Sequence, residues 1–171
     1  MNIQDHIRIV PDFPKPGINF YDIATLLKHP QVWRETIAKL ERITEPLKPD
    51  MLMGIEARGF LVASALAHEM NVSFGMVRKH GKLPGQTLSH TYSLEYGEDK
   101  IEIQPDLVPA GARVVVVDDL LATGGTMHAA ETLIQKTGAH VVGHVAIIEL
   151  EGLNGKDKLD AQFNALLKCP A

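Results

Sequence analysis

One stretch of the sequence decides the fold: Val114-Val115-Val116-Val117-Asp118-Asp119-Leu120-Leu121-Ala122-Thr123-Gly124-Gly125-Thr126. The run of valines predicts a strand that is buried on both faces, as in a parallel sheet covered by helices. Two adjacent carboxylates end this strand, and a loop with two glycines then opens a helix. In open sheets of this kind, ligands bind at the carboxyl ends of the strands. The stretch therefore predicts an α/β fold with a binding site from Asp118 to Gly125.

The loop in this stretch has the features of a phosphate site. Glycines let backbone N–H groups approach a phosphate closely, a helix N-terminus adds partial positive charge, and the hydroxyls of Thr123 and Thr126 add donors. The carboxylates of Asp118 and Asp119 suit the two hydroxyls of a ribose, either directly or beside a hydrated metal ion. No lysine follows Gly125 as a P-loop requires, and the spacing is not that of a dinucleotide fingerprint. A simpler interpretation stays open, in which the aspartates end a strand and the glycines make a turn.

The same order of strand, loop and helix occurs elsewhere in the chain. Apolar runs predict two more parallel strands, and the spacing of apolar residues predicts three helices, with Gly138 as the C-cap of the last. A second loop at a strand end is Glu56 to Gly59. The predicted strands are Met51 to Ile55, Arg113 to Val117 and Val141 to Ile148, and the predicted helices are Val32 to Ile43, Phe60 to Met70 and Met127 to Thr137.

Two segments lack this pattern. Arg78 to Gly97 is rich in Gly, Lys, Thr and Ser, and contains the turn signal Pro84-Gly85. A loop of this length in a compact domain is typical of an active-site lid or a disordered excursion. Near the N-terminus, three prolines precede Gly17, which predicts a stiff, extended path without helix.

Composition narrows the functional classes. The 171 residues fit one domain, residues 1–171, and a hydrophobic content of 45% is enough for one core. The net charge of −4, without a block of like charge, argues against a nucleic-acid partner. We expect a soluble cytoplasmic protein, because the sequence shows no secretory signal and no apolar run of membrane-spanning length. The single cysteine, Cys169, excludes an internal disulfide, and the eight histidines show no zinc spacing.

The central stretch resembles the binding motif for 5-phosphoribosyl-1-pyrophosphate (PRPP) of the type I phosphoribosyltransferases. The resemblance implies a core of parallel strands with helices on both sides, a small hood at about residues 1–35 that binds the base, and a flexible catalytic loop at about residues 79–96. In this family Asp118 and Asp119 would hold the ribose hydroxyls. The 5′-phosphate would bind the loop residues Ala122, Thr123, Gly124, Gly125 and Thr126. Members of the family are commonly homodimers.

Further segments are similar to the adenine-specific enzymes of this family. These segments are Phe13 to Phe20, Glu56 to Phe60, Arg78 to Gly85, and Ser93 to Gly97. Ala122 supports the same branch, because enzymes for 6-oxopurines usually carry an aspartate there. The resemblance implies an enzyme of purine salvage that joins adenine to the ribose of PRPP, giving AMP and pyrophosphate.

The resemblance also implies roles for residues outside the central stretch. Phe20 would stack on the purine, and backbone carbonyls near Asn19 and Tyr21 would accept from its amino group, although many relatives have a small apolar residue and an arginine at these two positions. Glu95 would take the purine proton, and Tyr96 would act beside it. Pyrophosphate would bind Glu56, Ala57 and Arg58, with Arg58 also catalytic, and the cations Arg78, Lys79 and Lys82.

The sequence also leads to an expected metal cofactor and leaves several rival functions open. Mg²⁺ is the expected cofactor, held mainly by substrate oxygens, because a divalent ion neutralises the departing pyrophosphate. The nearest rival is a phosphoribosyltransferase for hypoxanthine, guanine or orotate. More distant rivals are a PRPP-sensing regulator that binds nucleic acid and a purely structural α/β domain.

Overall fold

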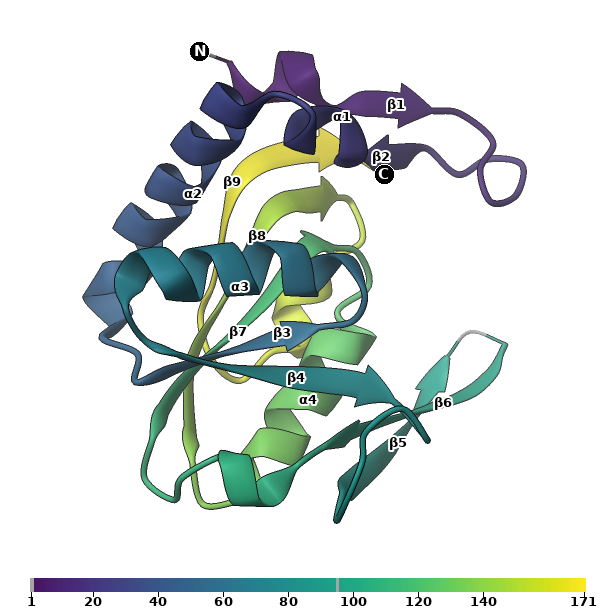
Figure 1. The fold of residues 1–171 in the computed structure, drawn as a ribbon. Helices are drawn as coiled ribbons and strands as arrows, with labels where there is room; N and C mark the ends of the chain where they lie inside the picture. Colours follow the sequence, from purple (N-terminus) through teal and green to yellow (C-terminus); the bar gives the residue numbers. More distant parts are fainter. Residues whose placement is uncertain (1, 95) are drawn as a thin grey trace.

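The computed structural model describes residues 2–94 and 96–171. Over these residues the core is a seven-stranded sheet in the order β5-β6-β4-β3-β7-β8-β9 (Figure 1). Five strands run parallel: β3 (Met51–Ile55), β4 (Ser73–Lys79), β7 (Arg113–Leu121), β8 (His140–Glu151) and β9 (Phe163–Pro170). The edge strands β5 (Leu88–Leu94) and β6 (Gly97–Ile103) form an antiparallel arm that pairs with β4.

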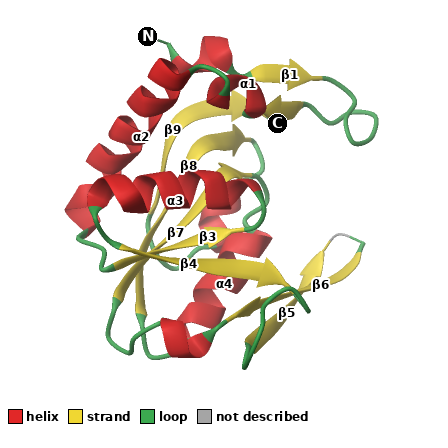
Figure 2. Cartoon of the chain, viewed as in Figure 1, coloured by secondary structure: helices red, strands yellow, loops and turns green. Residues whose placement is uncertain are grey.

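Helices cover both faces of the sheet (Figure 2). The helices α2 (Pro30–Thr44) and α3 (Arg58–Met70) pack on one face, and α4 (Gly125–Gln135) packs on the other. The short helix α1 (Ala24–Leu27) precedes α2. Single 3₁₀ turns are η1 (Ile3–His6), η2 (Glu45–Leu47), η3 (Pro105–Leu107) and η4 (Gly155–Lys158).

The valine run explains why both faces are covered. Successive side chains of a strand point to opposite faces. Val115 and Val117 join the core under α2 and α3, whereas Val114 and Val116 join the core under α4. All four side chains are completely buried. The expected α/β fold with a parallel sheet between helices is therefore confirmed.

The predicted elements are found, with shifted ends. The strand Met51–Ile55 is as predicted, but β7 continues four residues beyond Val117 and includes both aspartates. The helices α3 and α4 each begin two residues earlier than expected. Their first turns contain Arg58-Gly59 and Gly125-Thr126, which carry no apolar periodicity. The C-cap of α4 is Lys136, and Gly138 follows two residues later.

The expectation of one long loop at residues 79–96 is wrong over much of its length. Residues 88–94 form β5, which pairs with β6 from Leu88 opposite Ile103 to Leu94 opposite Gly97. Residues 80–87 connect β4 to β5 without regular structure. Most β5 side chains are polar and partly exposed, so the strand lacks the apolar run that marked the central strands. The strands β4 and β9 were also not predicted.

Within residues 1–35, where a hood is expected, β1 (Arg8–Val10) and β2 (Phe20–Asp22) form a two-stranded antiparallel ribbon, and we call this ribbon the hood. The helix α1 and the start of α2 contribute Leu26 and Val32 to the main core. The connection between β1 and β2 contains no helix, as predicted, but it folds back on itself and is not extended. Phe13 donates its backbone N–H to the Ile18 carbonyl at 3.1 Å, and the Gly17 N–H bonds Asp12 Oδ1 at 2.8 Å. The Tyr21 hydroxyl donates to the Pro170 carbonyl at 2.6 Å. The ribbon is thus attached to the carboxyl end of β9 (Figure 1).

None of the helices in the described part of the chain has both the length and the apolar character needed to cross a membrane.

Candidate active site

A small pocket lies where β7 ends and α4 begins. It has a volume of about 110 Å³ and is lined by Asp118 and residues 120–127. We call residues 122–126 the phosphate loop. The backbone of Gly124 is left-handed, with φ of +84°. The loop therefore turns directly into the N-terminus of α4, whose first backbone N–H groups have no partners within the helix. This geometry suits an anion.

The two aspartates at the end of β7 have different surroundings. Asp119 is buried, and its Oδ2 lies 2.8 Å from Arg58 Nε. Asp118 lines the pocket, and its Oδ1 accepts the backbone N–H of Asp119 at 2.8 Å. Burial of the carboxyl group, followed by the neighbouring Asp119 carboxylate, raises the pKa of Asp118 well above its usual value. The pair therefore favours either a shared proton or a nearby cation.

Arg58 connects this pair to the hood. Its guanidinium carbon lies 4.6 Å from the centre of the Phe20 ring, in a cation–π contact. The Phe13 ring packs edge-on against Phe20, with ring centres 5.1 Å apart. The structure thus brings Phe20, Arg58 and Asp119 together, although they come from three separate elements.

The residues expected at pyrophosphate gather at the ends of β3 and β4. Arg78 Nη2 lies 3.3 Å from Glu56 Oε2, and the backbone N–H of Lys79 donates to Glu56 Oε1. The Glu56–Ala57 peptide is cis. A pocket of about 180 Å³ contains these side chains and also reaches Asp118 and Thr126. Glu56, Arg78, Lys79 and Asp118 thus line one pocket.

Lys82 is separate from that pocket. It lines an adjoining cavity of about 600 Å³ on the arm, together with Lys79 and Lys100. Its backbone carbonyl accepts from Arg78 Nη1 at 3.5 Å. The structure therefore groups Glu56, Arg78 and Lys79, and leaves the Lys82 side chain on the exposed connection between β4 and β5.

A larger and more open cavity of about 670 Å³ lies beside the phosphate loop, and Asn19, Phe20 and Tyr21 are not among its lining residues. It is bounded by the tip of the arm, the hood connection and the phosphate loop, and its lining residues are Lys15, Ser93, Leu94, Tyr96, Thr123, Gly125, Thr126 and Lys158. Tyr96 is 82% exposed, and Lys15 Nζ lies 5.7 Å from its ring centre. Glu95, expected to take the purine proton, lies outside the described residues. Asn19 is exposed, whereas the Tyr21 side chain is buried in the hood, so only its main chain is free to contact a base.

Three contributors were missed by sequence reasoning. The Tyr92 hydroxyl lies 3.0 Å from Thr126 Oγ1, which connects the arm to the phosphate loop. Lys15 and Lys158 line the cavity of about 670 Å³. Lys15 lies in the Phe13 to Phe20 segment, but the resemblance gave it no role, and no local motif marks Tyr92 or Lys158.

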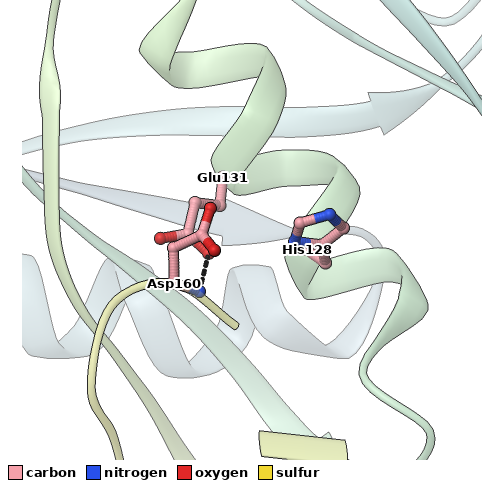
Figure 3. Close-up of side chains that lie close together, drawn as sticks. All are labelled: His128, Glu131 and Asp160. Carbon is pink, nitrogen blue, oxygen red and sulfur yellow. Dashed lines mark hydrogen bonds between the residues drawn. The ribbon is translucent and has the colours of Figure 1, made fainter. Parts of the chain in front are cut away.

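A second polar cluster lies further along α4 (Figure 3). His128, Glu131 and Asp160 offer possible ligand atoms within 4.8 Å of one another. However, Glu131 already accepts the backbone N–H groups of Asp160 and Ala161, at 3.1 and 2.9 Å. The cluster is therefore explained as a structural contact between α4 and the chain before β9.

Comparison with known proteins agrees with this site. A family model described as the phosphoribosyl transferase domain matches residues 22–169. The adenine phosphoribosyltransferase of Rhodospirillum centenum is 57% identical over 167 residues, which cover 98% of each chain. The chain belongs to the phosphoribosyl transferase family. The resemblance to this family seen in the sequence is thereby confirmed.

Solved phosphoribosyltransferases place the chain in the adenine branch of the family. The crystal structure of adenine phosphoribosyltransferase from Thermoanaerobacter pseudethanolicus matches with a TM-score of 0.95 and 46% identity, over 98% of each chain. The Saccharomyces cerevisiae enzyme matches with a TM-score of 0.91 and 38% identity, over 96% of each chain. That structure is a complex with an imino-altritol bisphosphate and adenine. Phosphoribosyltransferases generally use Mg²⁺ together with PRPP.

Proposed function

We propose that this chain is an adenine phosphoribosyltransferase, which transfers the phosphoribosyl group of PRPP to adenine and releases AMP and pyrophosphate in purine salvage. One observation carries the proposal: the phosphate loop and the pyrophosphate residues open into a space joined by Asp118 and Thr126. PRPP has the same order of groups, with a 5′-phosphate, a ribose and a pyrophosphate. The adenine relatives and the presence of Ala122 support adenine as the acceptor.

The sugar phosphate would be bound by the end of β7 and the start of α4. The phosphate loop donates backbone N–H and threonine hydroxyl groups to the 5′-phosphate. Asp118 and Asp119 accept the ribose hydroxyls. Since Asp119 is paired with Arg58 in the structure, binding of the sugar would exchange that ion pair for hydrogen bonds to the substrate.

Pyrophosphate would be received by the ends of β3 and β4. The backbone of residues 56–58 would donate to this group, the Arg58 guanidinium would turn toward it on leaving Asp119, and Arg78 and Lys79 would supply further positive charge. Lys82 would join them when the connection of residues 80–87 folds over the pocket. Stabilising negative charge on the leaving group in this way lowers the barrier to its departure.

A magnesium ion fits the chemistry of this pocket. Burial and the neighbouring Asp119 carboxylate raise the pKa of Asp118, so a cation bound beside the pair would favour the ionised form of this carboxyl group. Carboxylate oxygens and water are the ligands that Mg²⁺ prefers. Asp118 and Asp119 would therefore approach the ion through water or through the ribose oxygens, while the ion neutralises pyrophosphate charge.

The base would bind between the hood and the arm. Phe20 stacks on adenine, and the main-chain carbonyls near Asn19 and Tyr21 accept from its amino group. Glu95 takes the purine proton, with Tyr96 beside it at the arm tip. Displacement at the anomeric carbon passes through an oxocarbenium-like state. Closure of the arm over this state would exclude water, which competes with adenine for the sugar.

We infer a cytoplasmic homodimer as the working form. The exposed apolar side chains of Leu61, Phe74 and Met76 lie on α3 and β4, where a second copy would cover them. This surface is outside the pockets described above.

The decisive experiment compares acceptors. We expect the purified protein, with Mg²⁺ and PRPP, to release pyrophosphate with adenine at least about a hundredfold faster than with hypoxanthine, guanine or orotate, because unpaired polar groups on the wrong base are costly. Pyrophosphate release is measured for each base in turn, and a reaction without a base gives the hydrolytic background. Equal rates across the panel would reject adenine as the specific acceptor.

A further inference from the structure

The phosphate loop lies directly against the connection between β8 and β9. Within that connection, Gly155 is buried, whereas residues 152–154 and 156–158 are exposed. A Cβ atom on Gly124 would lie 2.2 Å from the Gly155 carbonyl oxygen, and one on Gly155 would lie 2.3 Å from the Ala122 carbonyl oxygen. Two backbone segments therefore touch without room for a side chain on either.

The contact comes from behind the loop. The residues that line the phosphate pocket are Asp118 and residues 120–127, so Gly155 does not face the bound group. Its effect on a ligand would pass through the backbone of Ala122 and Gly124. A shift of that backbone would move the donor N–H groups on the opposite side of the loop.

The connection that carries Gly155 is fastened to α4 by Glu131. This side chain is fully buried, and its Oε2 accepts the backbone N–H of Asp160 (Figure 3), while its Oε1 accepts that of Ala161. His144 Nε2, on β8, lies 3.1 Å from Glu131 Oε2. Since α4 also begins at the phosphate loop, one helix holds both segments of the contact.

We propose that Gly155, held in place by Glu131, is a positioning residue for the 5′-phosphate of PRPP. Phosphate affinity depends on N–H groups fixed at the correct positions before the ligand arrives. The contact with Gly155 supplies that fixation from outside the pocket. The inference rests on the proposed function, which assigns the 5′-phosphate to this loop.

The test compares two alanine variants in the same connection. Gly155→Ala places a methyl group at the Ala122 carbonyl and displaces the loop, so the PRPP dissociation constant and KM should rise about tenfold or more, since a shift of about 1 Å can cost about a hundredfold in rate. The KM for adenine should stay unchanged, and kcat at saturating PRPP should fall much less. Binding of PRPP with Mg²⁺ is measured by calorimetry, and KM and kcat by AMP formation.

Gly152→Ala is the matched control. Gly152 has φ of +85°, and no atom lies within 4 Å of an added Cβ. This variant should unfold at lower temperature because its backbone is strained, yet bind PRPP as the unmodified protein does. An unchanged PRPP dissociation constant in Gly155→Ala, or an equal rise in both variants, would overturn the proposal.

A second variant covers the case in which Gly155→Ala does not fold. Glu131→Gln keeps the size of the side chain but offers only one oxygen to the two N–H donors, so PRPP affinity should again fall. Normal PRPP affinity in this variant would also overturn the proposal. If the unmodified protein binds PRPP but forms no AMP from adenine, the proposed function fails, while the binding comparison still decides the role of Gly155.

Discussion

Asp118 and Asp119 are neighbours in sequence, yet only Asp119 has a cation, Arg58, in direct contact. Burial and the adjacent carboxylate leave Asp118 with a pKa well above its usual value. The folded chain therefore holds a proton on Asp118 over a pH range in which the unfolded chain has lost it. By linkage, the stability contributed by this neutral carboxyl is present below the unfolded pKa and is lost as pH rises through the folded pKa.

Asp118→Asn should remove the loss of folding stability that accompanies ionisation of Asp118 as pH rises. We expect the variant to become more stable relative to the unmodified protein as pH rises from about 4 to about 8, because the amide cannot ionise. Urea unfolding across this range, without Mg²⁺ or PRPP, measures the difference, and Asp106→Asn on exposed η3 serves as control. PRPP use should fall in the same variant, because the amide replaces a carboxylate that is proposed to accept a ribose hydroxyl. Parallel stability profiles for the variant and the unmodified protein would contradict the assignment of this proton to Asp118.

The proposed roles of Asp119 in ribose binding and of Glu95 in proton transfer should affect different kinetic constants. Asp119→Asn should raise KM for PRPP, since it weakens the hold on the ribose hydroxyls and leaves Arg58 without its partner. Glu95→Gln should lower kcat by about a hundredfold or more, the usual worth of a general base, with PRPP affinity nearly unchanged. Steady-state kinetics and PRPP calorimetry on both variants check this. A fully active Glu95→Gln enzyme would remove Glu95 from the mechanism.

At the scale of elements, the sequence predicted the strands that are buried on both faces of the sheet. It missed the strands that are buried on one face only. The strand Met51–Ile55 and the valine run were found because continuous apolar residues mark central parallel strands. The arm strand β5 was read as loop, since its sequence Leu-Ser-His-Thr-Tyr-Ser-Leu is mostly polar and its pairing partner β6 supplies the order. Pairing with a later segment is a tertiary effect that local pattern does not report.

In the site, too, the features encoded in one contiguous stretch were predicted, and those that depend on contacts between distant segments were not. The loop from Ala122 to Thr126 was predicted from one contiguous stretch, and the structure forms a pocket there. The Arg58 contacts with Phe20 and Asp119 join three elements, and nothing in their local sequence shows them. The contact of Gly155 with the phosphate loop was missed for the same reason.

At the scale of the whole molecule, the hood depends on the far end of the chain. The Tyr21 hydroxyl donates to the Pro170 carbonyl, which joins residues almost the whole sequence apart. The Tyr21 side chain therefore anchors the hood ribbon to the end of β9.

Tyr21→Phe tests that anchor. Loss of one partly buried hydrogen bond should lower the free energy of unfolding by about 1 kcal/mol. The KM for adenine should rise a few-fold because the hood ribbon carries Phe20, whereas the KM for PRPP should not change. Thermal unfolding and kinetics with each substrate varied in turn measure both effects. Equal rises in the two KM values would show that the hood and the sugar site are not separable.

The close approach of Gly124 and Gly155 limits how this enzyme can be recombined with its relatives. A chimera that takes residues 122–126 from one parent and the β8–β9 connection from another combines two backbone segments whose close packing is present in neither parent. Crossovers for a chimeric library therefore belong before β7 or after Ala161. The phosphate loop, the β8–β9 connection and the Glu131 side chain that bonds this connection then come from the same parent.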